Sequence, residues 1–188
     1  YAFDFEWTNT NIFYDAYTRT TSYFSKSEYA SSGLPEGKEL ALLEGLRDNV
    51  PASVFTEAFT VPVTDGSGNN REQLRKAKQL LEEAGWVVQD GVLVHGDTGE
   101  PLTIEILLSS PAYERPTSPF VRNLQRLGIQ ASIRTIDAAQ YIKRMEEFDY
   151  DMVIGSFGQS LSPGNEQKDY WHSASADIPG SRNTIGIK

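Results

Sequence analysis

A repeating order of strand-like and helix-like patterns between residues 102 and 154 limits most strongly how this chain can fold. The order is a strand at 102–108, a helix at 118–127, a strand at 131–136, a helix at 137–145 and a strand at 152–154. Strands that are joined through a helix pair in parallel, and their crossovers are right-handed almost without exception. The sequence therefore predicts the α/β class, with a mixed sheet, βαβ crossovers and flanking helices.

Turn and capping residues set the expected limits of the elements around this repeat. Asn70 opens an N-x-x-Q capping box before a helix with an apolar stripe, and Gly85 stands where a left-handed C-cap belongs. Asp90-Gly91 then predicts a tight hairpin. Within the repeat, we expect Ser118-Pro119 to begin one helix and Asp137 to cap the next.

The first 70 residues are less regular. Asp4 is placed to cap a short helix that runs towards Tyr14. Residues 17–24 are rich in β-branched and aromatic side chains and are predicted to be extended. A helix is expected at 38–50, where a proline follows, whereas residues 51–70 show no periodicity.

Composition and charge exclude several classes of function. The formal net charge is -9 at pH 7, and nucleic-acid binding needs clustered Lys and Arg, so we expect no nucleic acid among the partners. No Cys is present, which excludes disulfides and thiolate chemistry, and no apolar run approaches the roughly 20 residues of a spanning helix. We expect a single domain over residues 1–188, with an irregular helix and loop region at 1–70 and an α/β core at 71–188.

The residues that could hold a metal or a cofactor are few. His95 and His172 lie far apart, neither has a helically spaced partner, and no HExxH motif is present. The run GSGNN lacks the Lys and the following Ser or Thr of a phosphate-binding loop. We therefore expect no metal and no cofactor, with both histidines at the surface.

A hydrolase that uses paired carboxylates stays open from the residues alone. Candidate carboxylates come from Asp149, Asp151, Glu166 and Asp169, and no GxSxG elbow is present. Because the chain contains 26 acidic residues, such a grouping does not discriminate between functions.

The stretch GSFGQSLSPGNEQKDYW at 155–171 follows the last predicted strand. That strand is an apolar run and is therefore expected to be buried. Ligand sites of α/β proteins gather at the carboxyl ends of strands. The stretch offers hydroxyls, amides and a carboxylate, and Tyr170 and Trp171 offer aromatic walls for a binding site. A solvated loop with both aromatics buried in the core explains the same residues, and the two interpretations stay open.

Several motifs resemble one known family. AFDFEW is similar to the Ala-Ile-Asp-Arg-Glu segment of the periplasmic oligopeptide-binding proteins, extracellular solute-binding family 5. LRKAKQLLEEAGW with EPLTIEILLSS, and QRLGIQASIRTIDAAQYIKRMEEFDYDMVIGSFG, resemble consecutive helices and strands of that family. The resemblance covers nearly the whole chain. NTNIFYDAYTRTTSYF, SGLP, QSLSPGNEQKDYW and GSRNTIGI are most similar to the YejA-type branch.

The resemblance implies a lobe like those of type II periplasmic binding proteins. The chain begins at Tyr1 without Met, and we expect it to be most of the C-terminal lobe of a larger, two-lobed protein. The implied protein is periplasmic, or secreted and membrane-associated. It captures oligopeptides or peptide-like compounds together with its N-terminal lobe and delivers them to an ABC permease. The resemblance also implies that it is not an enzyme. A non-peptide solute such as an oligosaccharide is an alternative ligand, because such ligands also occur in this family.

One departure from the family pattern concerns the ligand's amino terminus. Many members have Trp-x-Ala-Asp-Tyr-x-x-Pro after this strand, and the Asp pairs with the α-amino group of the peptide. In this chain Gln159 or Ser160 occupies the place of that Asp. The resemblance therefore implies either that another carboxylate, with Glu166 the first candidate, meets the amine, or that the amine is not recognised in this way.

These considerations give a set of expected ligand-binding residues. They are Gln159, Ser160, Leu161, Ser162, Asn165, Glu166 and Trp171 in the stretch after the strand, with Tyr17 and Arg19 from the N-terminal part. Arg19 also fits a surface ion pair. Arg182 and Asn183 either line the same site or order a turn.

Overall fold

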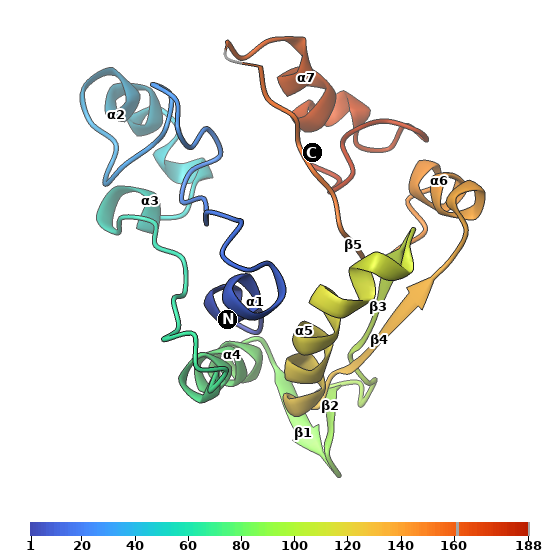
Figure 1. Ribbon diagram of the computed structural model, residues 1–188. Coiled ribbons are helices and arrows are strands. Elements are labelled where there is room, and N and C mark those ends of the chain that lie inside the picture. Colours follow the sequence, from blue (N-terminus) through green and yellow to red (C-terminus); the bar gives the residue numbers. More distant parts are fainter. Residues whose placement is uncertain (161, 188) are drawn as a thin grey trace. The chain divides into compact units, whose positions relative to one another are not determined.

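The computed structural model describes residues 1–160 and 162–187 of the chain (Figure 1). Its elements follow in the order α1 (Phe5–Ile12), α2 (Gly37–Glu44), η1 (Arg47–Asn49), α3 (Ser53–Thr56), α4 (Arg71–Glu83), β1 (Trp86–Gln89), β2 (Val92–His95), β3 (Thr103–Leu108), η2 (Pro111–Tyr113), α5 (Glu114–Arg126), β4 (Gln130–Thr135), α6 (Ala138–Glu146), β5 (Met152–Val153), α7 (Asn165–Trp171) and η3 (Ser173–Ser175). From β3 to β5 the order of strand, helix, strand, helix, strand is the predicted one. The α/β class is confirmed.

A three-stranded parallel sheet organises this part of the chain. β3 is its central strand, with β4 on one side and β5 on the other. On the β5 side, Ile106 aligns with Met152 and Leu107 aligns with Val153. Because β4 and β5 flank β3, the connection through α6 crosses the central strand. The carboxyl ends of all three strands therefore meet at one edge of the sheet.

The hydrophobic core lies between this sheet and α5, which lies along β3 and β4 (Figure 1). Ile106, Leu107 and Leu108 are each at most 1% exposed, as expected for a strand that is covered on both faces. Val121 and Leu124 contribute the buried face of α5. Burial on this scale fixes the register of the central strand, because a shift by one residue would turn its side chains to the opposite faces.

The hairpin β1–β2 confirms the prediction made for Asp90-Gly91. Both residues have positive φ, 50° and 84°, as a type I′ turn requires. The hairpin packs against the end of α5, where the amide of Leu93 donates to the carbonyl of Gly128 at 2.8 Å. A Cβ atom on Gly128 would lie 2.9 Å from the Leu93 nitrogen, and the φ of Gly128 is +88°. Both the close contact and the backbone angle therefore require glycine at this position.

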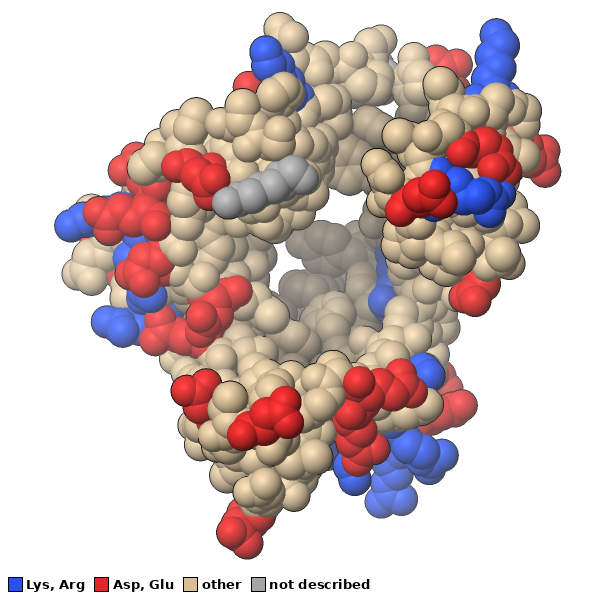
Figure 2. Space-filling view, turned by 180° about the vertical axis from the view of Figure 1, so that it is seen from behind, with Lys and Arg blue, Asp and Glu red and all other residues tan. Residues whose placement is uncertain are grey.

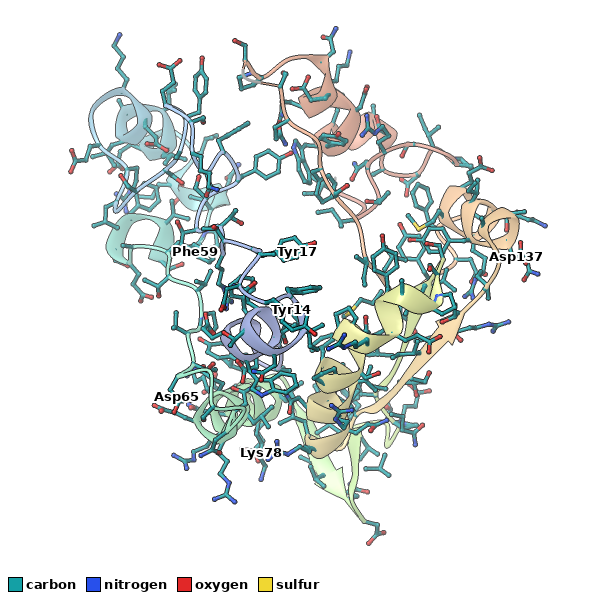
Figure 3. All side chains as sticks on the ribbon, viewed as in Figure 1. Tyr14, Tyr17, Phe59, Asp65, Lys78 and Asp137 are labelled. Carbon is teal, nitrogen blue, oxygen red and sulfur yellow. The ribbon has the colours of Figure 1, made fainter. Side chains whose placement is uncertain are left out.

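Two predicted helix caps are confirmed. The side chain of Asp4 accepts a hydrogen bond from the Trp7 amide at 3.1 Å and begins α1. Asp137, labelled in Figure 3, begins α6 and accepts hydrogen bonds from the amides of Ala139 and Gln140, each at 3.0 Å. Each carboxylate thus satisfies amides that have no partner within the helix.

The chain divides into two compact units, Tyr1–Ala16 with Val63–Lys188, and Tyr17–Pro62. The irregular region expected at 1–70 is therefore shared between them, because residues 1–16 and 63–70 pack with the α/β core. That this chain is one domain of a larger lobe stays a prediction.

The unit Tyr17–Pro62 contains no buried residue. Its most compact feature is a group of rings, in which the Phe24 ring centroid lies 4.8 Å from that of Tyr23 and 6.2 Å from that of Tyr29. The prediction that residues 17–24 are extended is wrong from residue 21 onwards, where bends and then turns form. The Ser25 hydroxyl donates to the Ser22 carbonyl at 2.8 Å, and such local hydrogen bonds compete with strand pairing.

Other helix limits in this unit also differ from the prediction. The helix expected at 38–50 ends at Glu44 with α2, and a short 3-10 turn, η1, follows it. α3 forms in a stretch that shows no periodicity in sequence. A helix of four residues offers too few turns for an apolar period to be recognised.

The start of α5 lies earlier than predicted. The helix begins at Glu114 and includes Pro119, which was expected to open it. The Ser-Pro signal operates instead at Ser110-Pro111, where the Ser110 hydroxyl accepts a hydrogen bond from the Ala112 amide and caps η2. Because η2 leads directly into α5, one capped turn serves both elements.

The capping box predicted for α4 is wrong, although the helix begins where expected, at Arg71. The Asn70 side chain donates to the Tyr1 carbonyl at 3.1 Å, and the Gln73 side chain donates to the Val63 carbonyl at 3.0 Å. Both amides therefore join α4 to other parts of its unit instead of satisfying its first turn.

The last strand is shorter and more exposed than predicted. β5 comprises Met152–Val153, which are only half-buried, and Ile154 is 45% exposed. β5 is an edge strand of the described sheet, so one of its two sides lacks a covering strand. Burial therefore decreases from the central strand β3 to the edge strand β5.

Substitution of Gly128 tests the packing of the hairpin on α5. We expect Gly128→Ala to lower the free energy of unfolding by about 2–4 kcal/mol, because the new Cβ meets backbone and the left-handed angle is strained. Gly91→Ala, which has a similar φ but open space around it, should cost only about 1 kcal/mol. Urea unfolding measures both values, and equal losses would contradict the close contact.

Candidate functional site

The segment 155–171 leaves the sheet at the carboxyl end of β5 and leads into α7. Within the described residues, the backbone groups of 155–157 take part in none of the hydrogen bonds that join the surrounding segments. The backbone N–H and C=O groups of 155–157 are therefore available to form hydrogen bonds with another extended chain.

Three aromatic rings hold the start of this segment against α7. The Phe157 ring centroid lies 5.2 Å from that of Tyr170, with nearly perpendicular planes, and 5.0 Å from that of Trp171. The Tyr170 hydroxyl donates to the Gly158 carbonyl at 3.2 Å, and Tyr170 is 2% exposed. Tyr170 is thus a core residue that fixes the segment, whereas Phe157 is 37% exposed.

Side-chain amides continue this connection. The Gln167 amide nitrogen donates to the amide oxygen of Gln159, and the Trp171 indole N–H donates to the amide oxygen of Gln167 at 3.2 Å. Gln167 and Trp171 are four residues apart on α7 and so share one face of the helix. The helix therefore positions Gln159 through Gln167.

The Glu166 carboxylate forms the next link. Its Oε1 atom accepts hydrogen bonds from the Ser160 hydroxyl at 2.9 Å and from the Gly164 amide at 3.0 Å. The Ser160 hydroxyl also lies within hydrogen-bonding distance of the Ser162 carbonyl. The backbone amides of Glu166 and Gly164, followed by the Ser160 hydroxyl, lower the pKa of Glu166 to about 2. The carboxylate is therefore ionised throughout the physiological range.

A cavity of about 310 Å³ lies beside the segment. Its walls come from α6, from residues 153–157 and from residues around 180–184; the lining residues are Tyr141, Ile142, Met145, Glu146, Val153, Ile154, Gly155, Ser156, Phe157, Tyr170, Gly180, Ser181, Arg182 and Thr184. Phe157 and Tyr170, whose rings pack together, therefore line both the cavity and the start of the segment. All these residues belong to the unit that contains the α/β core.

Most of the predicted site residues lie together in this segment. Gln159, Ser160 and Glu166 are joined by the hydrogen bonds described above, and Trp171 packs on Phe157. Ser162 and Asn165 are exposed in the same segment, and Leu161, also predicted, lies outside the described residues. Tyr17, labelled in Figure 3, and Arg19 belong to the unit Tyr17–Pro62, so their part in the same site stays a prediction.

Arg182 and Asn183 have different positions. Asn183 is fully buried and exchanges hydrogen bonds with the backbone of Ile187 at 2.8 and 2.9 Å, so it orders the turn that follows it. Arg182 lines the cavity, donates to the Tyr170 hydroxyl, and places its guanidinium carbon 4.5 Å from the centre of the Tyr170 ring. Of the two, only Arg182 is next to the candidate site.

Three of the four carboxylates considered for hydrolysis, Asp149, Asp151 and Glu166, have structural partners, whereas Asp169 is exposed on α7. Asp149 lies 2.8 Å from the Arg144 guanidinium, and Asp151 accepts a hydrogen bond from the Glu105 amide at 2.8 Å. Among residues 1–160 and 162–187, no group of three or more His, Cys, Asp and Glu side chains is arranged to hold a metal ion. The carboxylates at the end of α6 therefore join elements of the fold.

The two histidines also contact their neighbours. The His95 ring lies edge-on to the Trp86 ring at 5.3 Å, and His172 accepts a hydrogen bond from the Ala174 amide at 3.1 Å, which begins η3. Each histidine therefore has a local role in the fold.

Sequence reasoning missed two residues that shape this site. Phe157 was noted only as part of a family pattern, and Gln167 was not singled out. The spacing of four residues between Gln167 and Trp171 is the signal that would have placed both side chains on one helix face. Nothing in the sequence indicates that Phe157 contacts both aromatics of α7.

Charges of both signs are mixed on one face of the molecule. On the face shown in Figure 2, Lys and Arg side chains are interspersed with Asp and Glu side chains and do not gather in a large basic patch. Within the part of the chain that the structure describes, no helix is both long and apolar enough to cross a membrane.

The comparisons with known proteins agree with this geometry. Residues 1–177 match the family model described as bacterial extracellular solute-binding proteins, family 5 Middle. A probable peptide-binding protein, YejA, from Agrobacterium fabrum is 46% identical over 188 residues, which cover 100% of this chain and 31% of the relative. A peptidoglycan-binding protein, YepA, from the same organism is 39% identical and is covered to 30%.

Solved structures give the same fold. The oligopeptide-binding protein AppA from Bacillus subtilis, in complex with a nonapeptide, matches 100% of this chain and 31% of its own with a TM-score of 0.66 and 19% identity. A periplasmic oligopeptide-binding protein from Thermotoga maritima, with bound mannohexaose, matches 98% of this chain and 31% of its own with a TM-score of 0.62 and 15% identity. The predicted fold, like a lobe of a type II periplasmic binding protein, is confirmed. The chain spans about 30% of the length of its relatives, and it belongs to the bacterial extracellular solute-binding proteins, family 5.

Proposed function

We propose that this chain is part of the solute-binding component of an ABC importer and that it captures oligopeptides or peptide-like compounds without changing them. The family match and the names of the relatives, one of them a probable peptide-binding protein, support this class of ligand. The complete protein works, in this proposal, outside the cytoplasmic membrane with an N-terminal lobe and a permease.

One observation carries the proposal: the Glu166 carboxylate lies against Ser160 at the carboxyl end of an α/β sheet. Gln159 or Ser160 stands where the family pattern has an Asp that pairs with the ligand's α-amino group. The Ser160 hydroxyl donates to the Glu166 carboxylate at 2.9 Å, so an acidic side chain six residues further along the chain lies next to position 160. Glu166 therefore supplies the negative charge that position 160 lacks.

The backbone next to this charge suits a peptide main chain. The unused N–H and C=O groups at 155–157 pair with extended peptides in the way that a strand edge pairs with an added strand. Backbone pairing is independent of side-chain identity, and the ionised carboxylate fixes the end of the peptide from which pairing begins. The combination favours a peptide with a free amino terminus.

Two alternatives to a peptide ligand have some support. The Thermotoga maritima structure contains mannohexaose, and the relative YepA is named for peptidoglycan binding, so an oligosaccharide or a peptidoglycan fragment is the second candidate class. A hydrolase is disfavoured because Asp149, Asp151 and Glu166 have partners within the fold. Incubation of the intact protein with peptides distinguishes a binding protein from a hydrolase, since a binding protein yields no products.

Glu166→Gln in the full-length protein tests the contact with the amino terminus. We expect affinity for a peptide with a free amino group to fall about tenfold, because a neutral amide replaces a charged hydrogen-bond acceptor. The same peptide with an acetylated amino terminus should bind equally to both proteins. Isothermal titration calorimetry measures all four affinities.

Asp169→Asn is the matched control, since Asp169 is an exposed carboxylate on the same helix. It should leave both affinities unchanged. An equal loss for the free and the acetylated peptide in Glu166→Gln would show that Glu166 only orders the segment, and it would contradict the proposed contact.

The ionisation of Glu166 gives a second prediction, on pH. Because the folded pKa of about 2 is below the unfolded value of about 4.3, the hydrogen bonds of Glu166 stabilise the segment fully above pH 4.3. This stabilisation is lost as the pH falls through about 2. Carbon-13 NMR of the labelled Glu166 carboxyl should show this low pKa, and Ser160→Ala should raise it. An unchanged value near 4.3 in both proteins would contradict the hydrogen bonds to Ser160 and Gly164.

A further inference from the structure

The cavity beside Phe157 is not used by the contact with the ligand's amino terminus. It lies on the side of residues 153–157 that faces α6, whereas Ser160 and Glu166 lie further along the segment. A peptide main chain that pairs with 155–157 would direct a side chain towards this cavity, because side chains leave an extended backbone to alternate sides. The cavity is therefore within reach of one side chain of a bound peptide.

The walls of the cavity are mainly apolar. Ile142, Met145, Val153 and Ile154 supply aliphatic surface, and Phe157 supplies an exposed aromatic face. Ile142 is 57% exposed and Ile154 is 45% exposed, so both offer surface that an apolar group would remove from water. Burial also raises the pKa of the Tyr141 hydroxyl, which agrees with a poorly hydrated wall.

The charged residues of the cavity are not equivalent. The Arg182 guanidinium already donates to the Tyr170 hydroxyl and stacks over the Tyr170 ring. Glu146 lines the same cavity, is exposed, and forms no ion pair with any residue in the described ranges. A tyrosine hydroxyl and ring do not neutralise the guanidinium charge, so Arg182 and Glu146 present one charge of each sign. The apolar walls are therefore the feature that distinguishes this cavity.

We propose that this cavity selects a large apolar side chain of a bound peptide. The inference rests on the proposed function, because it requires a peptide along 155–157. The side chain of Phe or Leu fills the space between the aliphatic walls. Specificity in this account comes from one cavity, while backbone pairing and Glu166 hold any peptide.

Tetra-alanine and its variants with Phe at each of the four positions test the proposal on the full-length protein. We expect Phe at one position to raise the affinity about 10- to 100-fold over alanine. Ile142→Glu should abolish the gain from Phe and leave the affinity for tetra-alanine within about twofold.

Ile178→Glu is the matched control, since Ile178 is 55% exposed, like Ile142, but does not line the cavity. It should preserve the gain from Phe. Binding of tetra-alanine without a gain from Phe at any position, or a gain that Ile142→Glu leaves intact, would overturn the proposal while the proposed function stands. Failure of every peptide to bind would overturn the proposed function and, with it, this inference.

Discussion

The parallel pairing of β5 with β3 is the interaction on which the candidate site depends. Only two residue pairs, Ile106 with Met152 and Leu107 with Val153, define it. They are sufficient because the second half of β3, Ile106–Leu108, is almost completely buried, so its position is fixed by the core and not by β5. The segment that follows β5 is thereby delivered to the edge where the carboxyl ends of the strands meet.

A second set of contacts supports the same pairing from outside the sheet. Arg144 on α6 lies 3.0 Å from the Glu105 carboxylate on β3 and 2.8 Å from that of Asp149, just before β5. The Asp151 carboxylate accepts a hydrogen bond from the Glu105 amide at 2.8 Å. Exposed ion pairs contribute little individually, but this network joins α6, β3 and the start of β5. Asp149 and Asp151, two of the carboxylates considered for hydrolysis, therefore help to position the edge strand.

Beyond β5, side-chain contacts replace regular secondary structure. Phe157 packs on Tyr170 and Trp171, Gln159 is held through Gln167, and Ser160 is held by Glu166. All of these anchors come from α7, a helix of seven residues. The segment keeps its backbone groups at 155–157 available because its fixation uses side chains. The same arrangement places a carboxylate at Ser160 without requiring an acidic residue there.

Sequence patterns predicted the parts of this fold that local residues determine. The strands and helices between 102 and 154, the turn at Asp90-Gly91 and the cap at Asp137 follow from periodicity and from turn chemistry. The failures have a different origin. The Asn70 side chain donates to the Tyr1 carbonyl instead of capping α4, which is a tertiary contact that local sequence does not reveal. The helical turn that leads into α5 begins at Ser110-Pro111 and not at the second Ser-Pro pair, Ser118-Pro119.

The candidate site divides in the same way. The resemblance to a family and the turn residues after a strand identified the segment, including Gln159, Ser160 and Glu166. The contact between Ser160 and Glu166, and the cavity beside Phe157, depend on how the segment returns to α7 and α6. Such returns are set by packing across many residues, and no short motif encodes them. Phe157 and Gln167 were missed for that reason.

A crystal structure of the full-length protein with a bound peptide tests the central claim most directly. The account predicts that the peptide backbone pairs with residues 155–157 and that its ammonium group lies within hydrogen-bonding distance of Glu166. A peptide bound elsewhere, with residues 155–166 free of contact, would contradict the account.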